Sequence, residues 1–377
     1  MMKTLEILDT LISFETTSNK SNLRLIKFVE EFLSQFGFRI NRLSSPCGTK
    51  AGIYAEIGPE IDGGILLSAH SDVVPTEGQN WSYPPFKLTP IDDRLYGRGT
   101  TDMKGFLASM LTLASRIDHK KLPNPLALLI TYDEEIGCVG LQQLKSQLTS
   151  LLRKPRLCVV GEPTEMQVAS GHKGKTAYQA TFNGQIGHSA LAPKFDNALH
   201  IAADFMSGLR NMQKQLAKSG PFDFDYDIPF TTIHVGKLSG GKALNIVPNY
   251  AEMLFEIRYL DAQNTDDLMI HIDTIARHFD KDNGLQNVNI EIINNYPGFE
   301  VKSNHENIRK LISITNTNRI KVDFGTEAGI LSQMGVPTLV CGPGSMSEQG
   351  HKADEFITKK QLFACDEFLT KLLAQSH

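Results

Sequence analysis

Four short apolar runs along the chain predict strands that are buried on both faces of a parallel or mixed sheet. The runs are Ile65–Ala69, Leu126–Tyr132, Leu157–Val160 and Thr338–Cys341. Each run is followed at once by residues of distinctive chemistry, namely histidines, carboxylates or glycines. Because ligand sites in open α/β sheets gather at the carboxyl ends of strands, this pattern predicts a site along one edge of the sheet.

The middle of the chain has a different pattern. Alternating and helical periodicities follow one another there in the order β-α-β-β-α-β, which predicts a small α+β module of the ferredoxin-like kind. The segments are Thr176–Asn183, Asn197–Lys218, Thr231–Leu238, Ala251–Tyr259, Asp266–Phe279 and Asn287–Ile293. We therefore expect an α/β domain built from residues 1–176 and 293–377, with residues 177–292 inserted as a second domain.

The composition is that of an ordinary globular protein of 377 residues, with 41% hydrophobic and 21% charged residues. A formal net charge of −4 argues against nucleic-acid binding, which needs clustered basic residues. The chain has no run of about 18 apolar residues that would predict a membrane span. The charges of Lys3, Glu6 and Asp9 interrupt the apolar stretch that a signal peptide needs, so we expect no signal peptide. Five scattered cysteines fit a reducing compartment, so we expect a cytoplasmic protein.

The residues after the first run have both a functional and an ordinary interpretation. His70 and Asp72 stand at positions i and i+2, and such a pair by itself is more often structural than metal-binding. Asp102 lies in the glycine-rich segment 97–105, before a helix predicted at Phe106–Leu113. It can simply cap that helix.

The residues after the other runs also have both a functional and an ordinary interpretation when each is considered alone. Glu134 and Glu135 are adjacent carboxylates, which usually occupy a solvated loop. Beside a cation, however, one can bind metal while the other acts as a general base. Glu162 follows a buried strand, where an unpaired carboxylate is costly. His351 follows a glycine-rich loop and can equally be a surface histidine.

Taken together, these residues offer two histidines and three carboxylates as ligands, with one glutamate to spare. Borderline divalent metals accept such a mixture, and zinc suits it, with cobalt as the alternative. No G-x-S-x-G elbow follows a predicted strand, which argues against a serine hydrolase. The joint pattern therefore indicates a metal centre.

The same segments resemble the M20 family of two-zinc aminoacylases, dipeptidases and deacetylases. The matching stretches, in chain order, are LSAHSDVVP (67–75), LYGRGTTDMKG (95–105), DEEIG (133–137), GEPT (161–164), GHSA (187–190), NIVP (245–248) and the C-terminal His351. The resemblance spans essentially the whole chain. It implies a mixed-sheet catalytic domain of the aminopeptidase type with an inserted lid and dimerisation domain, and hence a homodimer.

The resemblance also implies a role for each residue of the predicted site. The implied ligand sets are His70, Asp102 and Glu162 for one metal, and Asp102, Glu135 and His351 for the other. Asp102 would bridge the two ions, Asp72 would orient His70, and Glu134 would be the general base. In this family the peptide bond after the bridging aspartate is often cis.

Three residues of the predicted inserted domain are further candidates. The resemblance implies that His188 stabilises the oxyanion, reaching across the dimer from the partner's lid; its ordinary alternative is a turn residue. Arg258 and Asn245 are candidates for binding the α-carboxylate of an acylated amino acid. Arg258 can equally be an outward residue of an alternating strand.

Within the family, the chain most resembles the branch that deacetylates N-acetylornithine, through residues 325–329 and 341–356. Glu327 and Asp323 are candidates for binding the side-chain ammonium of ornithine. The branch that removes succinyl groups from diaminopimelate usually has Ser-Asp where this chain has Glu327-Ala328. Succinyl-diaminopimelate and other N-acyl amino acids remain alternative substrates. A non-catalytic binding protein of this fold is disfavoured, because no ligand is missing.

Overall fold

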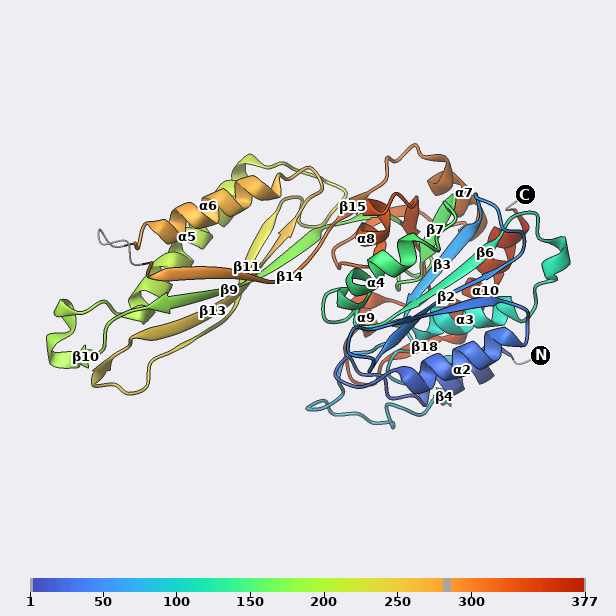
Figure 1. The fold of residues 1–377 in the computed structure, drawn as a ribbon, viewed down its shortest axis with the longest axis horizontal. Coiled ribbons are helices and arrows are strands. Elements are labelled where there is room, and N and C mark those ends of the chain that lie inside the picture. Colours follow the sequence, from blue (N-terminus) through green and yellow to red (C-terminus); the bar gives the residue numbers. More distant parts are fainter. Residues whose placement is uncertain (1–2, 281–285, 376–377) are drawn as a thin grey trace. The chain divides into compact units, whose positions relative to one another are not determined.

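The computed structural model describes residues 3–280 and 286–375, which divide into two compact units (Figure 1). The larger unit consists of the chain up to His172 and from Phe299 onward, and the second unit is Lys173–Gly298. The domain boundaries predicted from the sequence, at 176/177 and 292/293, fall within the first and last long strands of the second unit.

The larger unit is built on a mixed sheet, as the apolar runs predicted. Its strands, in spatial order, are β1 (Arg39–Ser44), β2 (Ala51–Ile57), β6 (Leu126–Thr131), β3 (Ile65–His70), β7 (Leu157–Val160), β17 (Thr338–Val340), β8 (Val168–His172) and β15 (Phe299–Glu300), with β16 (Arg319–Val322) paired to β8. The central pairs β6–β3, β3–β7 and β7–β17 are parallel. All residues of β3, β6 and β7 are buried, which confirms these strands as the two-sided core.

Helices cover both faces of this sheet. They are α1 (Thr4–Ile12), α2 (Leu23–Ser34), α3 (Lys104–Ala114), α4 (Val139–Thr149), α7 (Glu306–Thr315), α8 (Ala328–Gln333), α9 (Met346–Gln349) and α10 (Lys359–Ala374). Every residue of α3 is buried, because α1, α10 and β3 all pack against it. A small sheet of β18 (Phe356–Thr358), β5 (Arg94–Tyr96) and β4 (Thr89–Ile91) joins the C-terminal segment to the segment before α3.

The second unit confirms the predicted β-α-β-β-α-β order. Its four-stranded antiparallel sheet has the spatial order β11 (Thr232–Gly240), β13 (Tyr250–Tyr259), β9 (Gly174–Asn183) and β14 (Val288–Tyr296). The helices α5 (Ala198–Ser219) and α6 (Thr265–Arg277) pack on it through the apolar face that includes Phe182 and Phe205. A short pair, β10 (Gly187–His188) with β12 (Ile246–Val247), was not predicted as strand.

None of the described helices combines the length and the apolar character needed to cross a membrane.

Shortening a side chain in the central sheet should destabilise the larger unit. Ile130 lies on β6 and is 0% exposed, so we expect Ile130→Val to lower the free energy of unfolding by about 1 kcal/mol. The matched control is Ile61→Val, because Ile61 is 48% exposed in the same unit. Urea unfolding followed by circular dichroism measures both. Equal stabilities of the two variants would contradict the assignment of β6 to the core.

Candidate metal centre and active site

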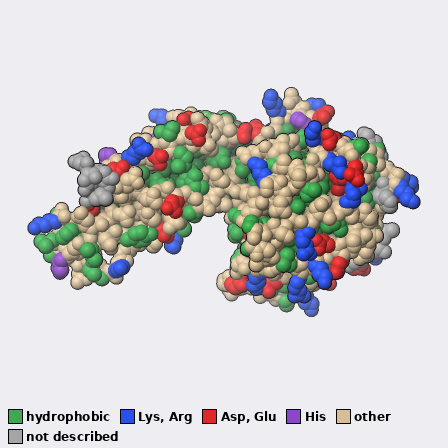
Figure 2. Space-filling view, in the orientation of Figure 1, with side chains coloured by type: hydrophobic (Ala, Val, Ile, Leu, Met, Phe, Trp, Pro, Cys, Tyr) green, Lys and Arg blue, Asp and Glu red, His purple; other side chains and the backbone are tan. Residues whose placement is uncertain are grey.

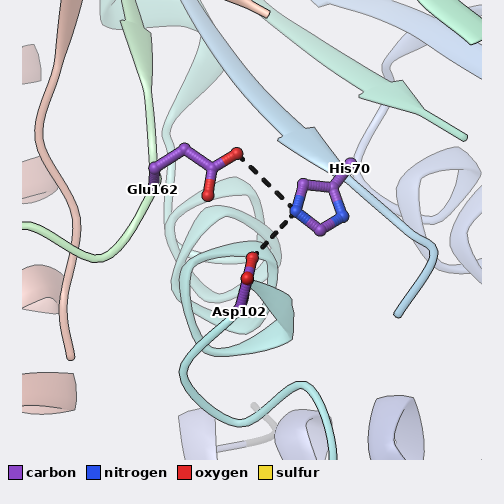
Figure 3. Close-up of side chains that lie close together, drawn as sticks. All are labelled: His70, Asp102 and Glu162. Carbon is purple, nitrogen blue, oxygen red and sulfur yellow. Dashed lines mark hydrogen bonds and ion pairs between the residues drawn. The ribbon is translucent and has the colours of Figure 1, made fainter. Parts of the chain in front are cut away.

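The first cluster of candidate ligands lies at the carboxyl edge of the central sheet. His70 is the last residue of β3, and Glu162 follows the adjacent parallel strand β7. Asp102 precedes α3, and Figure 3 shows all three side chains converging. His70 Nε2 lies 3.0 Å from Asp102 Oδ1 and 3.6 Å from Glu162 Oε1. The three residues are 1%, 4% and 2% exposed, so this cluster is closed to bulk solvent.

The second cluster shares Asp102 with the first. The second carboxylate oxygen of Asp102 lies 3.4 Å from His351 Nε2, which in turn lies 3.0 Å from Glu135 Oε2. Glu135 follows β6, and His351 lies on the loop after α9 with its side chain 53% exposed. Asp102 therefore offers one oxygen to each of two groups that can hold a metal ion.

The chemistry of these residues fits divalent cations. Burial, together with the Asp102 carboxylate, raises the pKa of Glu162 well above its ordinary value and that of Glu135 to about 7. Hydrogen bonds to Asp102 and Glu135 raise the pKa of His351 to about 10. One buried oxygen each of Glu135 and Glu162 has no hydrogen-bond partner. A cation at each cluster would satisfy these oxygens and balance the concentrated negative charge.

Asp72 joins the first cluster to the glutamate pair. The Nδ1 of His70 lies 2.9 Å from the backbone carbonyl of Asp72 and 3.6 Å from its carboxylate. That carboxylate instead accepts hydrogen bonds from the backbone N–H groups of Glu134, at 3.2 Å, and Glu135, at 3.3 Å. The closest partner of the imidazole is thus the main chain of Asp72, whereas the Asp72 side chain fixes the turn that carries the two glutamates.

Glu134 lies beside both clusters. Burial and the charge of neighbouring Glu135 raise the pKa of Glu134 well above its ordinary value. The turn is also held by Asp133, whose backbone has φ 56° and whose carboxylate pairs with Lys50. An acid–base group is therefore held next to two candidate metal positions, as hydrolysis of an amide or peptide bond requires.

The family of this chain follows from its sequence. The model of peptidase family M20/M25/M40 matches residues 66–375. The chain belongs to this family. The resemblance drawn from the motifs is thereby confirmed, and the protein is an M20 hydrolase.

Named M20 relatives and solved M20 structures match almost the full chain. The acetylornithine deacetylase of Pasteurella multocida is 32% identical, over 97% of this chain and 94% of the relative. That of Vibrio parahaemolyticus is also 32% identical, over 94% and 93%. The M20 metallo-carboxypeptidase of Sulfolobus solfataricus has the same fold, with TM-score 0.82, 18% identity and coverage of 100% and 99%. A dinuclear metal-binding M20 peptidase of Bacillus subtilis has TM-score 0.67 at 16% identity, over 98% and 96%.

Three predicted site residues of this M20 chain lie in the second unit. His188, on β10, is exposed, and its Nδ1 accepts a hydrogen bond from the N–H of Ala190. Asn245 is exposed just before β12, so the β10–β12 pairing brings it next to His188. Arg258, on β13, donates to Glu256 and to the hydroxyl of Tyr296.

The two candidates for the ornithine ammonium differ in burial. Glu327 is only 2% exposed; one carboxylate oxygen accepts a hydrogen bond of 2.8 Å from Thr131, and the other has no partner. Burial raises the pKa of Glu327 to about 8. Asp323 is exposed, directly after β16. Of the two, Glu327 contacts the last residue of β6, just before the segment that carries Glu134 and Glu135.

Sequence reasoning missed several residues that hold the site. Ser18 donates to the Asp72 carboxylate at 2.7 Å, and Lys50 pairs with Asp133. Glu355 is fully buried and accepts the backbone N–H of Asp102. No local pattern marks these contacts, because the partners are 54, 83 and 253 residues apart in the chain.

Proposed function

We propose that this M20 hydrolase cleaves the amide bond of N2-acetyl-L-ornithine with the help of two divalent metal ions, releasing L-ornithine and acetate, a step of arginine biosynthesis. The observation that carries the chemistry is the sharing of Asp102 between two ligand clusters beside a buried glutamate. The substrate is supported by the named relatives, which are 32% identical over nearly the whole chain.

The proposed ligands are those of the two clusters. His70, Asp102 and Glu162 hold one ion, and Asp102, Glu135 and His351 hold the other. The mixture of imidazole and carboxylate favours zinc, with cobalt as the alternative. When bound, the ions supply an acidified water and polarise the amide carbonyl.

Glu134 is the proposed general base and acid. It takes a proton from the attacking water as the water oxygen bonds to the acetyl carbon, and the carbon–nitrogen bond then breaks. Glu134 returns that proton to the departing α-nitrogen, which leaves as the amine. Asp72 links Glu134 to His70, because its carboxylate accepts the backbone N–H of Glu134 and its backbone carbonyl lies against Nδ1 of His70. In this proposal a single side chain carries the proton from the attacking water to the leaving nitrogen.

Four residues are proposed to contact the substrate. Arg258 and Asn245 bind the α-carboxylate of the substrate, and Glu327, with Asp323 nearer the surface, receives the side-chain ammonium. Arg258 already donates to Glu256 and Tyr296, so the substrate carboxylate would join an existing polar group. The unpartnered buried oxygen of Glu327 is the acceptor that an ammonium group would satisfy.

A homodimer is the proposed assembly, in which His188 of one subunit stabilises the oxyanion formed in the other. The support lies around the β10–β12 pair, where apolar side chains are exposed. Ile186 is 64% exposed, Leu191 48% and Leu244 fully, and Figure 2 shows hydrophobic side chains on the surface of this unit. Such exposure is typical of a surface that contacts a partner. The five cysteines, all free, fit the proposed cytoplasmic location.

A panel of acylated amino acids tests the substrate. We expect zinc-loaded protein to hydrolyse N-acetyl-L-ornithine with a higher kcat/KM than N-acetyl-L-norvaline, which has the same carbon chain without the ammonium. N-succinyl-diaminopimelate and a dipeptide complete the panel. Preference for either of these, or for norvaline, would reject acetylornithine and leave the hydrolytic mechanism standing. Hydrolysis of no member by metal-loaded protein would favour a non-catalytic binding protein.

Replacing Glu327 by glutamine should reduce discrimination for ornithine, because an amide cannot form an ion pair with the substrate ammonium. A hydrogen bond to a charged group contributes about 1.5–3 kcal/mol. We therefore expect Glu327→Gln to lower kcat/KM for N-acetyl-L-ornithine by about 10- to 100-fold. The norvaline derivative should be affected much less. Equal losses on both substrates would show that Glu327 serves the site without binding the ammonium.

A further inference from the structure

A fully buried carboxylate that takes no part in the proposed reaction lies next to the second cluster. Glu355 is 0% exposed and accepts four hydrogen bonds from one short segment. One oxygen accepts from Arg98 Nη1 at 2.8 Å and from the N–H of Gly99 at 2.9 Å. The other accepts from the N–H groups of Thr101, at 2.8 Å, and Asp102, at 3.0 Å. The segment that Glu355 binds therefore ends at the residue shared by both clusters.

Arg98 extends these contacts to the other ligand-bearing loop. Its side chain is 1% exposed, and its guanidinium carbon lies 4.9 Å from the ring centre of Trp81. Its Nη2 donates to Gln79 Oε1 at 2.6 Å, and Gln79 Nε2 donates to the backbone carbonyl of His351 at 2.8 Å. A continuous polar chain thus runs from the backbone of the Asp102 segment to the backbone of His351.

The two clusters differ in what holds their ligands. His70 and Glu162 come from the ends of adjacent core strands, which the sheet itself keeps in register. Asp102 and His351 come from segments outside any strand, and His351 has φ 60° and a half-exposed side chain. Segments without ladder hydrogen bonds depend on side chains for a fixed geometry. Glu355 and its partners meet that need for the second cluster.

We propose that Glu355, through Arg98 and Gln79, is a positioning residue for the second metal site. It holds the backbone of Asp102 and that of His351 at a separation that one metal ion can bridge. The inference rests on the proposed metal binding and is independent of the choice of acetylornithine as substrate. Groups of this kind, which orient ligands without touching the metal, typically change metal affinity by about 10- to 100-fold when replaced.

Cobalt binding to chelator-treated protein tests this role. Calorimetry gives the affinities of the two sites, and the visible absorption of cobalt reports the geometry of each. We expect Glu355→Gln to weaken the second site by about 10- to 100-fold and to alter its spectrum, with a smaller loss at the first site, which shares Asp102. Gln79→Ala, at a half-buried position, should shift the second site in the same direction by less.

A matched control separates positioning from general stability. Glu56, on β2, is also a buried carboxylate, 4% exposed, and it pairs with Arg39 and Arg153. Glu56→Gln should leave both cobalt sites unchanged.

Several results would overturn the inference. These are unchanged cobalt affinities and spectra in both test variants, an equal loss in the Glu56 control, or a wild-type protein that binds a single cobalt ion. If Glu355→Gln does not fold, the Gln79 variant decides. Two bound ions without hydrolysis of any acyl amino acid would reject the proposed substrate class, while the effect of Glu355→Gln on cobalt binding would still decide this inference.

Discussion

Replacing Glu134 by glutamine should abolish most hydrolysis while both metal ions remain bound. The amide keeps the size of the side chain but cannot take a proton from water. General acid–base catalysis contributes about 100- to 10,000-fold, so we expect kcat for N-acetyl-L-ornithine to fall by that factor. Stopped assays of acetate release, with metal content measured on the same samples, test this.

A matched control and two outcomes define this prediction. Glu348→Gln changes an exposed carboxylate on α9 and should leave kcat unchanged. A Glu134→Gln variant with near wild-type kcat would show that another group carries the proton. Loss of metal together with activity would mean that Glu134 is a ligand and not the base.

Replacing Asp102 should have the broadest effect on metal binding, because one carboxylate serves both clusters. We expect Asp102→Asn to weaken both sites and to reduce hydrolysis below detection. His351→Ala should weaken only the second site, since His70 and Glu162 still hold the first. Metal content after dialysis, measured by atomic emission, distinguishes the two variants.

The two variants together test whether Asp102 is shared by both metal sites. If Asp102→Asn lost one ion and kept the other at wild-type affinity, Asp102 would not be a shared ligand. If His351→Ala lost both ions, the sites would be coupled more strongly than the geometry indicates. Far-UV circular dichroism of each variant checks that the fold is retained.

The core of the fold and most members of the candidate ligand clusters could be predicted because their signals are local. β3, β6 and β7 appear as uninterrupted apolar runs, and His70 and Glu162 follow two of them directly. The ordinary interpretation of Asp102 as a helix cap is wrong. The cap position of α3 is Met103, without a side-chain cap, and the Asp102–Met103 bond is cis.

Other features of the site were beyond sequence reasoning for physical reasons. Lys50, Arg98 and Glu355 act through partners far along the chain, and charged residues in loops carry no periodicity. The choice of the Asp72 carbonyl over its carboxylate as the nearer partner of His70 depends on backbone geometry that spacing does not reveal. The unpredicted β10–β12 pair has two residues per strand, too short for any alternating pattern.

The central claim is that this chain is an amidohydrolase whose two metal clusters are required for catalysis. The most direct measurement is the rate of N-acetyl-L-ornithine hydrolysis as zinc is added back to chelator-treated protein. The account predicts no turnover without metal and full activity once two equivalents are bound. Metal-free protein that hydrolyses the substrate at the rate of the loaded enzyme would contradict it.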